Sequence, residues 1–183
     1  MRRRTKARET AMQFLYQVDL RGEAVWSDVE AFLENASKDG VLPDADAREF
    51  ARRLILGTKR HRDEIDTLLK SVARNWDLRR MAAVDRNILR MSAYEMLWCR
   101  DVPPKVAINE AIELGKRFST ANSGAFVNGI LDRIRIDKLG NSEKKLDESK
   151  PLEEPRDDAA PPSGEPPEPP PEPPLDDGES AGL

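Results

Sequence analysis

The chain has 183 residues, of which 35% are charged, and its formal net charge is −4. One cysteine excludes an intramolecular disulfide, and one histidine leaves no His/Cys cluster with metal-ligand spacing. No apolar run approaches the ~20 residues that a membrane-spanning helix needs. These features favour a cytoplasmic protein that binds no metal or cofactor and does not contact a membrane.

Charge and proline content divide the chain near Gly140. Eleven of the 14 prolines follow this residue. Residues 141–183 carry 13 acidic and four basic side chains, whereas the part before them has a net charge of +5. A Pro-rich acidic segment with few apolar residues cannot offset its ordering entropy. We therefore expect a folded, mildly basic domain over residues 1–140 and a disordered Pro/Glu-rich tail over residues 141–183.

Four helices are expected in the first half of the folded domain, where apolar residues recur at helical spacing. The first helix ends near Gly22. Ser27 and Glu30 have the spacing of a capping box and predict the start of the second helix. Asp44 opens the third helix, and Gly57 is expected to break or bend it before the fourth.

The second half of the folded domain is expected to supply three more helices. Residues 78–98 are apolar on more than one side, which is typical of a central, buried helix. Two prolines place a turn at residues 101–104, and helices of about 105–118 and 123–136 follow it. Because no internal repeat is present, we expect a single compact all-α bundle of about seven helices.

Nothing in the sequence indicates catalysis. His61 lies among basic residues, whose charge disfavours its protonated form, and a solvated helical position explains it better than a catalytic base does. Cys99 follows an apolar row and is interpreted as a small hydrophobic residue. The isolated glycines match neither a phosphate-binding loop nor a dinucleotide fingerprint. We therefore expect the protein not to be an enzyme.

The start of the chain is strongly basic. Its five bases are Arg2, Arg3, Arg4, Lys6 and Arg8. Such a run is either a solvated terminus without a function or an arm that neutralises RNA phosphates and orders on binding. In the second interpretation, changing Arg4, Lys6 and Arg8 together to Ala weakens RNA binding and leaves folding nearly unchanged.

A second candidate RNA surface lies at residues 116–126, where bases and small polar residues precede a predicted helix start. Single-stranded RNA is read by base stacking on aromatic rings and by hydrogen bonds to base edges. Phe126 is either such a stacking platform or a core residue that faces inward with Ile130. The alternative inward row, which leaves the ring out, is Val127, Leu131 and Ile134.

Three strings of the sequence resemble the NusB antitermination family: ARETAMQFLYQVD, VPPKVAINEAIELGKRF and SGAFVNGILDRI. They occur in family order, and the likeness covers roughly residues 4–138. The resemblance implies an all-α transcription antitermination factor that binds boxA-type single-stranded RNA of ribosomal RNA leaders. It also implies two protein partners, the small-subunit ribosomal protein NusE and the transcription elongation complex.

The resemblance also implies site residues. Those expected to bind RNA are Arg4, Lys6, Arg8, Asn122 and Phe126, and this expectation favours the stacking interpretation of the ring. Those expected near the NusE partner are Tyr16 and Asp85. For the protein without its partners, both a monomer and a homodimer that masks the RNA surface stay open.

Two features depart from the family pattern. Some members have an acidic residue where this chain has Asn122, and the amide donor of Asn alters the RNA contact expected there. The acidic tail also has no counterpart in the family. A second interpretation of the chain is a non-catalytic protein-interaction or dimerisation module, related to the RNA-binding domain of RNA cytosine methyltransferases. Measured RNA binding separates the two interpretations.

Overall fold

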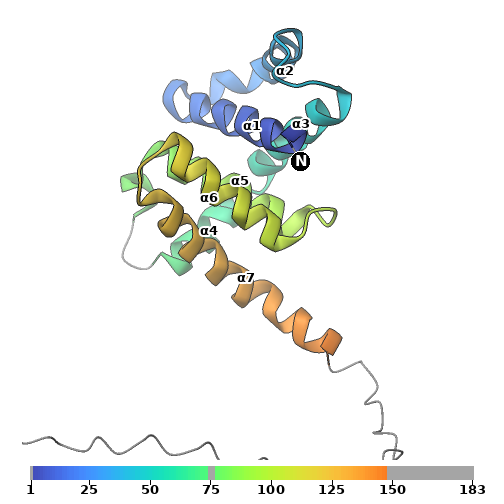
Figure 1. Cartoon of the computed structure of the whole chain (residues 1–183). Helices are drawn as coiled ribbons and strands as arrows, with labels where there is room; N and C mark the ends of the chain where they lie inside the picture. Colours follow the sequence, from blue (N-terminus) through green and yellow to red (C-terminus); the bar gives the residue numbers. More distant parts are fainter. Residues whose placement is uncertain (1, 74–76, 148–183) are drawn as a thin grey trace, which may run out of the picture. The chain divides into compact units, whose positions relative to one another are not determined.

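The structure is a computed structural model that describes residues 2–73 and 77–147. This part of the chain forms seven α-helices and two short 3-10 helices (Figure 1). The α-helices are α1 (Arg2–Arg21), α2 (Val29–Lys38), α3 (Ala45–Arg60), α4 (Arg62–Val72), α5 (Ala83–Trp98), α6 (Pro104–Phe118) and α7 (Ser123–Asp147). The 3-10 helices are η1 (Glu23–Asp28) and η2 (Leu78–Arg80). The predicted all-α bundle of about seven helices is confirmed.

Helix α5 is the centre of the bundle, as its apolar composition predicted. It packs against α1, α3, α4, α6 and α7, and every side chain from Asn87 to Met96 is buried. Helices α6 and α7 pack closely on each other, and the C-terminal end of α7 extends beyond the other helices (Figure 1). No helix among the described residues is both long and apolar enough to cross a membrane.

The predicted capping box at the start of the second helix is wrong. Ser27 lies inside η1, where its hydroxyl donates to the Ala24 carbonyl oxygen at 2.8 Å. The residue that precedes α2 is Asp28, whose side chain makes no capping hydrogen bond. Glu30 instead forms an ion pair with Arg52 of α3. The extra helical turn of η1 therefore takes the serine out of the capping position.

The break between the third and fourth helices lies at His61 and not at Gly57. Asp44 caps α3 as expected, because its carboxylate accepts from the Ala47 amide at 2.9 Å. Gly57 is an ordinary helical residue of α3, and the Tyr94 ring of α5 occupies the space beside it. A Cβ at position 57 would lie 1.9 Å from Tyr94 Cζ. The glycine therefore serves helix packing and not helix termination.

Helix α7 is longer than the sequence pattern indicated. It continues to Asp147, beyond both the expected helix end at residue 136 and the expected domain boundary at residue 140. The chain has no proline between Pro104 and Pro151, so no residue in that stretch is unable to continue a helix. The remaining predictions for the tail concern residues 148–183, which lie outside the described residues.

Candidate nucleic-acid interface

The exposed bases at the start of α1 point in different directions. The Arg4 guanidinium lies 3.1 Å from the Asp101 carboxylate and 4.8 Å from the centre of the Phe50 ring. The Lys6 ammonium lies 2.9 Å from the Glu9 carboxylate. Two helical positions two residues apart differ by about 200° around the helix axis. The structure therefore does not bring Arg4 and Lys6 onto one face.

Arg8 is buried, although it belongs to the same basic run. Its side chain is 3% exposed, and Nε and Nη2 donate to the Glu95 carboxylate at 3.0 and 2.6 Å. Glu95 itself is fully buried in α5, and Glu110 of α6 lies 3.4 Å from Arg8 Nη1. A phosphate can reach this guanidinium only if these ion pairs break. We therefore expect a large loss of stability when Arg8 is replaced, in place of the small one predicted from the sequence.

Arg117 of α6 shares an acidic partner with Lys6 of α1. Glu9, which is 6% exposed, forms ion pairs with both Lys6 and Arg117. The Arg117 side chain is largely exposed, and its guanidinium also lies 5.0 Å from the centre of the Phe118 ring. The sequence indicates Arg117 only as part of the second candidate surface, residues 116–126. Its link to the first helix spans 108 residues, and no local pattern indicates such a contact.

Hydrogen bonds fix the turn that leads into α7. Ser123 Oγ donates to Asp85 Oδ2 at 3.1 Å, and the Thr120 amide donates to Ser123 Oγ at 3.1 Å. The backbones of α6 and α7 approach closely here, because a Cβ at Gly115 would lie 3.4 Å from the Gly124 nitrogen. Asn122 is exposed at the end of this turn. The Asn122 side chain therefore lies on a turn that these hydrogen bonds hold in place.

Phe126 lies at the rim of the core. The row of buried residues on this helix is Val127, Ile130, Leu131 and Ile134. The inward row Val127, Leu131 and Ile134 is buried, and so is Ile130, which was expected to face inward together with Phe126. The Phe126 ring itself is half-buried and packs against the edge of the core. Asn122 and Phe126 are one helical turn apart, and the Phe126 amide donates to the Asn122 carbonyl oxygen at 3.2 Å. The two predicted RNA-binding residues of this segment thus lie next to each other.

The two residues expected near a protein partner differ in exposure. Tyr16 is half-buried on α1. Asp85 is only 8% exposed, with one carboxylate oxygen bonded to Ser123 and the other buried without a hydrogen-bond partner among the described residues. Asp85 therefore holds the start of α7 on α5, and its carboxylate is not presented at the surface.

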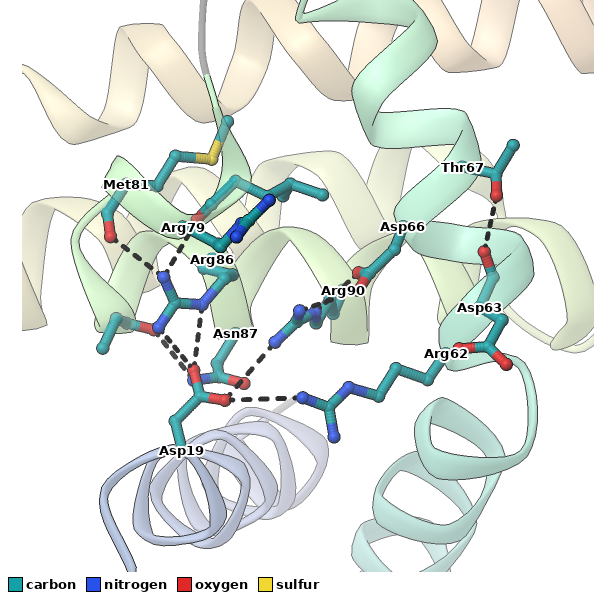
Figure 2. A network of polar contacts seen from close by, with 12 residues as sticks. Asp19, Arg62, Asp63, Asp66, Thr67, Arg79, Met81, Arg86, Asn87 and Arg90 are labelled. Atoms are coloured by element: carbon teal, nitrogen blue, oxygen red, sulfur yellow. Dashed lines mark hydrogen bonds and ion pairs between the residues drawn. The ribbon is translucent and has the colours of Figure 1, made fainter. Parts of the chain in front are cut away.

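A polar network that the sequence analysis missed joins α1, α4 and α5 (Figure 2). Asp19 of α1 accepts from Arg86 Nε at 3.0 Å, from Asn87 Nδ2 at 2.9 Å and from Arg90 Nη1 at 3.4 Å. Figure 2 shows Arg62 reaching the same carboxylate from α4. The three partners in α5 lie 67 to 71 residues from Asp19 along the chain. Sequence spacing could not have indicated contacts over such separations.

His61 and Cys99, the two candidate catalytic residues of the sequence, are both packed against other side chains of the protein. His61 stacks on Trp98, with ring centres 4.3 Å apart. Cys99 is 3% exposed, and burial raises the pKa of its thiol. Among the described residues, no group of three or more His, Cys, Asp or Glu side chains could hold a metal ion.

The buried thiol gives a simple prediction. Because its pKa is raised, Cys99 stays protonated at neutral pH, and only the thiolate attacks a disulfide reagent. We expect a much slower reaction with Ellman's reagent in the folded protein than in urea. Equal rates in the two states would contradict the buried position of Cys99.

Residues 5–135 match the family model described as the NusB family. The chain belongs to the NusB family. It is 46% identical over 144 residues to the transcription antitermination protein NusB of Desulfatibacillum aliphaticivorans, an alignment that covers 79% of this chain and 96% of that protein. The predicted role as a non-enzymatic transcription antitermination factor is confirmed by this membership. The interpretation as a methyltransferase-related interaction module is not supported.

Solved NusB structures have the same fold. T. maritima NusB aligns with a TM-score of 0.68 and 39% identity, covering 78% of this chain and 97% of that chain. A crystal structure of the antitermination factors NusB and NusE in complex with dsRNA aligns with a TM-score of 0.63 and 33% identity, covering 73% of this chain and 96% of that chain. The NusB fold of the chain therefore rests on both sequence and structure.

Proposed function

We propose that this NusB-family protein binds boxA-type single-stranded RNA jointly with NusE and acts in the cytoplasm as part of the transcription elongation complex. The observation that carries the proposal is the family match over residues 5–135, which includes the exposed Asn122 and the rim residue Phe126. The solved complex of a NusB with NusE and dsRNA supports both partners. RNA binding is thus the activity for which the start of α7 is best suited.

The proposed RNA surface combines the start of α7 with nearby bases. Asn122 supplies an amide for base edges, and Phe126 supplies a ring face for stacking. Lys6 and Arg117 supply positive charge around Glu9, where a phosphate competes with that carboxylate for both bases. Arg4 is proposed as a separate phosphate contact on the Asp101 side of α1.

Two of the expected site residues are assigned supporting roles in this proposal. Arg8 holds α1 on α5, so that the exposed bases of α1 keep their positions. Asp85 holds Ser123, and through it the turn that presents Asn122. Tyr16 is the residue of this set that a protein partner can touch directly, because part of its side chain is exposed.

The proposed function is tested by reconstitution. Purified protein, NusE and a boxA RNA oligonucleotide are expected to form a ternary complex that is tighter than either binary complex. A matched oligonucleotide with a scrambled boxA measures specificity. Equal binding of the two RNAs, or no effect of NusE, would contradict the proposal. Sedimentation of the protein alone decides between a monomer and a homodimer.

Phe126→Ala separates RNA stacking from core packing. The loss of a stacking ring is expected to cost about 1–3 kcal/mol of RNA affinity. Stability should fall by much less than the roughly 3–5 kcal/mol typical of a fully buried phenylalanine, because the ring is only half-buried. RNA titration and urea denaturation of the same variant measure the two effects. Unaltered RNA affinity together with a large stability loss would assign Phe126 to the core.

A further inference from the structure

Two of the open cavities lined by charged side chains in the described part have net charges of opposite sign. The larger, of about 680 Å³, lies beside Arg4. Its acidic side chains are Asp44, Asp46, Glu49 and Asp101, and its bases are Arg3, Arg4 and Arg53. The Arg53 guanidinium donates to Asp101 and lowers the pKa of that carboxyl, which is therefore charged at neutral pH. This cavity has no surplus of positive charge to attract a phosphate.

The second cavity, of about 290 Å³, lies beside the Asp19 network and has a positive surplus. Its bases are Arg62, Lys70, Arg79, Arg86 and Arg90, and its acids are Asp19, Asp66 and Asp77. All three carboxylates already have arginine partners. Lys70 has no ion-pair partner within residues 2–73 and 77–147. The side chain of Arg79, which lies 3.8 Å from Asp77, is still 93% exposed. Positive charge is therefore left over at the open side of this cavity.

Hydrogen bonds hold the arginine side chains at the inner side of the cavity in place. Arg86 is anchored by four hydrogen bonds: Nε and Nη2 donate to Asp19, and Nη1 donates to the carbonyl oxygens of Leu78 and Met81. Arg90 is held between Asp19 and Asp66 (Figure 2). Side chains fixed in this way lose little conformational entropy when an anion binds beside them. Arg86 contributes mainly its fixed positive charge to an anion in the cavity, because its Nε, Nη1 and Nη2 groups already donate to Asp19, Leu78 and Met81.

The cavity is close to the proposed RNA surface. Asp85 and Arg86 are consecutive residues of α5, and the first bonds Ser123 at the start of α7 while the second lines the cavity. Helix α4, which carries Lys70, packs against α7. The cavity and the start of α7 thus lie on neighbouring elements, so that one RNA strand can reach both.

We propose that the cavity lined by Lys70, Arg79 and Arg86 binds a backbone phosphate of the RNA strand that contacts the start of α7. This inference rests on the proposed RNA-binding function and extends it by one contact site. Lys70 and Arg79 supply the charge at the mouth of the cavity, and Arg86 supplies a fixed guanidinium behind them.

The test uses the double variant Lys70→Ala/Arg79→Ala of the full chain. Both side chains are exposed, so thermal unfolding should be unchanged. Affinity for the boxA oligonucleotide is expected to fall severalfold, and the slope of log affinity against log salt should decrease by about 0.7 for one lost phosphate contact. The control Lys38→Ala/Arg48→Ala removes the same charge from α2 and α3, away from the cavity, and should change neither quantity by as much.

Three outcomes are distinguishable. If the unchanged protein does not bind the oligonucleotide, the proposed function fails. If it binds, but the Lys70/Arg79 variant matches it in affinity and slope, the phosphate site is overturned. A variant that loses NusE affinity while its binding to RNA alone is unaltered would also overturn the site, and would assign the cavity to an acidic protein surface.

Discussion

Arg8→Ala is expected to lower the free energy of unfolding by about 3–5 kcal/mol, the usual cost of removing one member of a buried ion pair. Glu95 is fully buried and receives three hydrogen-bond contacts from Arg8. Without the guanidinium, its carboxylate loses the charge that compensates it in the core. Urea denaturation followed by circular dichroism measures the change.

Two matched variants identify the cause of this loss. Arg4→Ala removes the same side chain from the same helix, but the Arg4–Asp101 pair is exposed and should contribute at most about 1 kcal/mol. Arg8→Met combined with Glu95→Leu removes both charges from the core and should recover most of the loss. If Arg8→Ala and Arg4→Ala proved equally mild, the buried pair would not be a main support of the fold.

Gly57→Ala is expected to destabilise the protein by about 3 kcal/mol or more, at the upper end of what overpacked cores show. The new Cβ would lie 1.9 Å from Tyr94 Cζ and 2.3 Å from the tyrosine oxygen. Tyr94 is buried in the central helix and stacks with His61, so its ring cannot move without disturbing other contacts. Thermal denaturation of the variant measures this effect.

Gly129→Ala is the control for helix propensity. Gly129 is also helical, and a Cβ there would meet no atom within 4 Å. The same substitution should therefore stabilise α7 by about 0.5–1 kcal/mol through the better helix propensity of alanine. If Gly57→Ala lowers the stability and Gly129→Ala raises it, then packing, and not helix propensity, requires glycine at position 57. A stabilising Gly57→Ala would contradict the described contact with Tyr94.

The sequence predicted the helices well because apolar spacing and turn residues are local signals. The Asp44 cap and the buried apolar rows of α5 are examples, and both follow from the spacing of residues within a few positions of one another. The capping box at Ser27 failed because the short helix η1 changed the position of that serine. The residue at which a helix begins or ends is set by competition between neighbouring turns, and a single motif does not determine it.

The candidate site was predicted less completely than the fold. Asn122 and Phe126 were found because family motifs mark them, whereas the burial of Arg8 was missed. A basic run has the same appearance in sequence whether its members face solvent or an acid in the core. Glu95 and Glu110, the residues that decide this for Arg8, are separated from it by 87 or more residues. The Asp19 network and the Glu9–Arg117 pair were missed for the same reason.

The long-range contacts of α1 also constrain the order of folding. This helix is synthesised first, yet its polar anchors in α5 and α6 lie 67 to 108 residues later. Closing such long loops is slow compared with forming a helix, so local helices are expected to precede the docking of α1. On the ribosome, Arg8 has no buried partner until α5 has emerged. The basic start of the chain is therefore held in its final place only when most of the domain has been made.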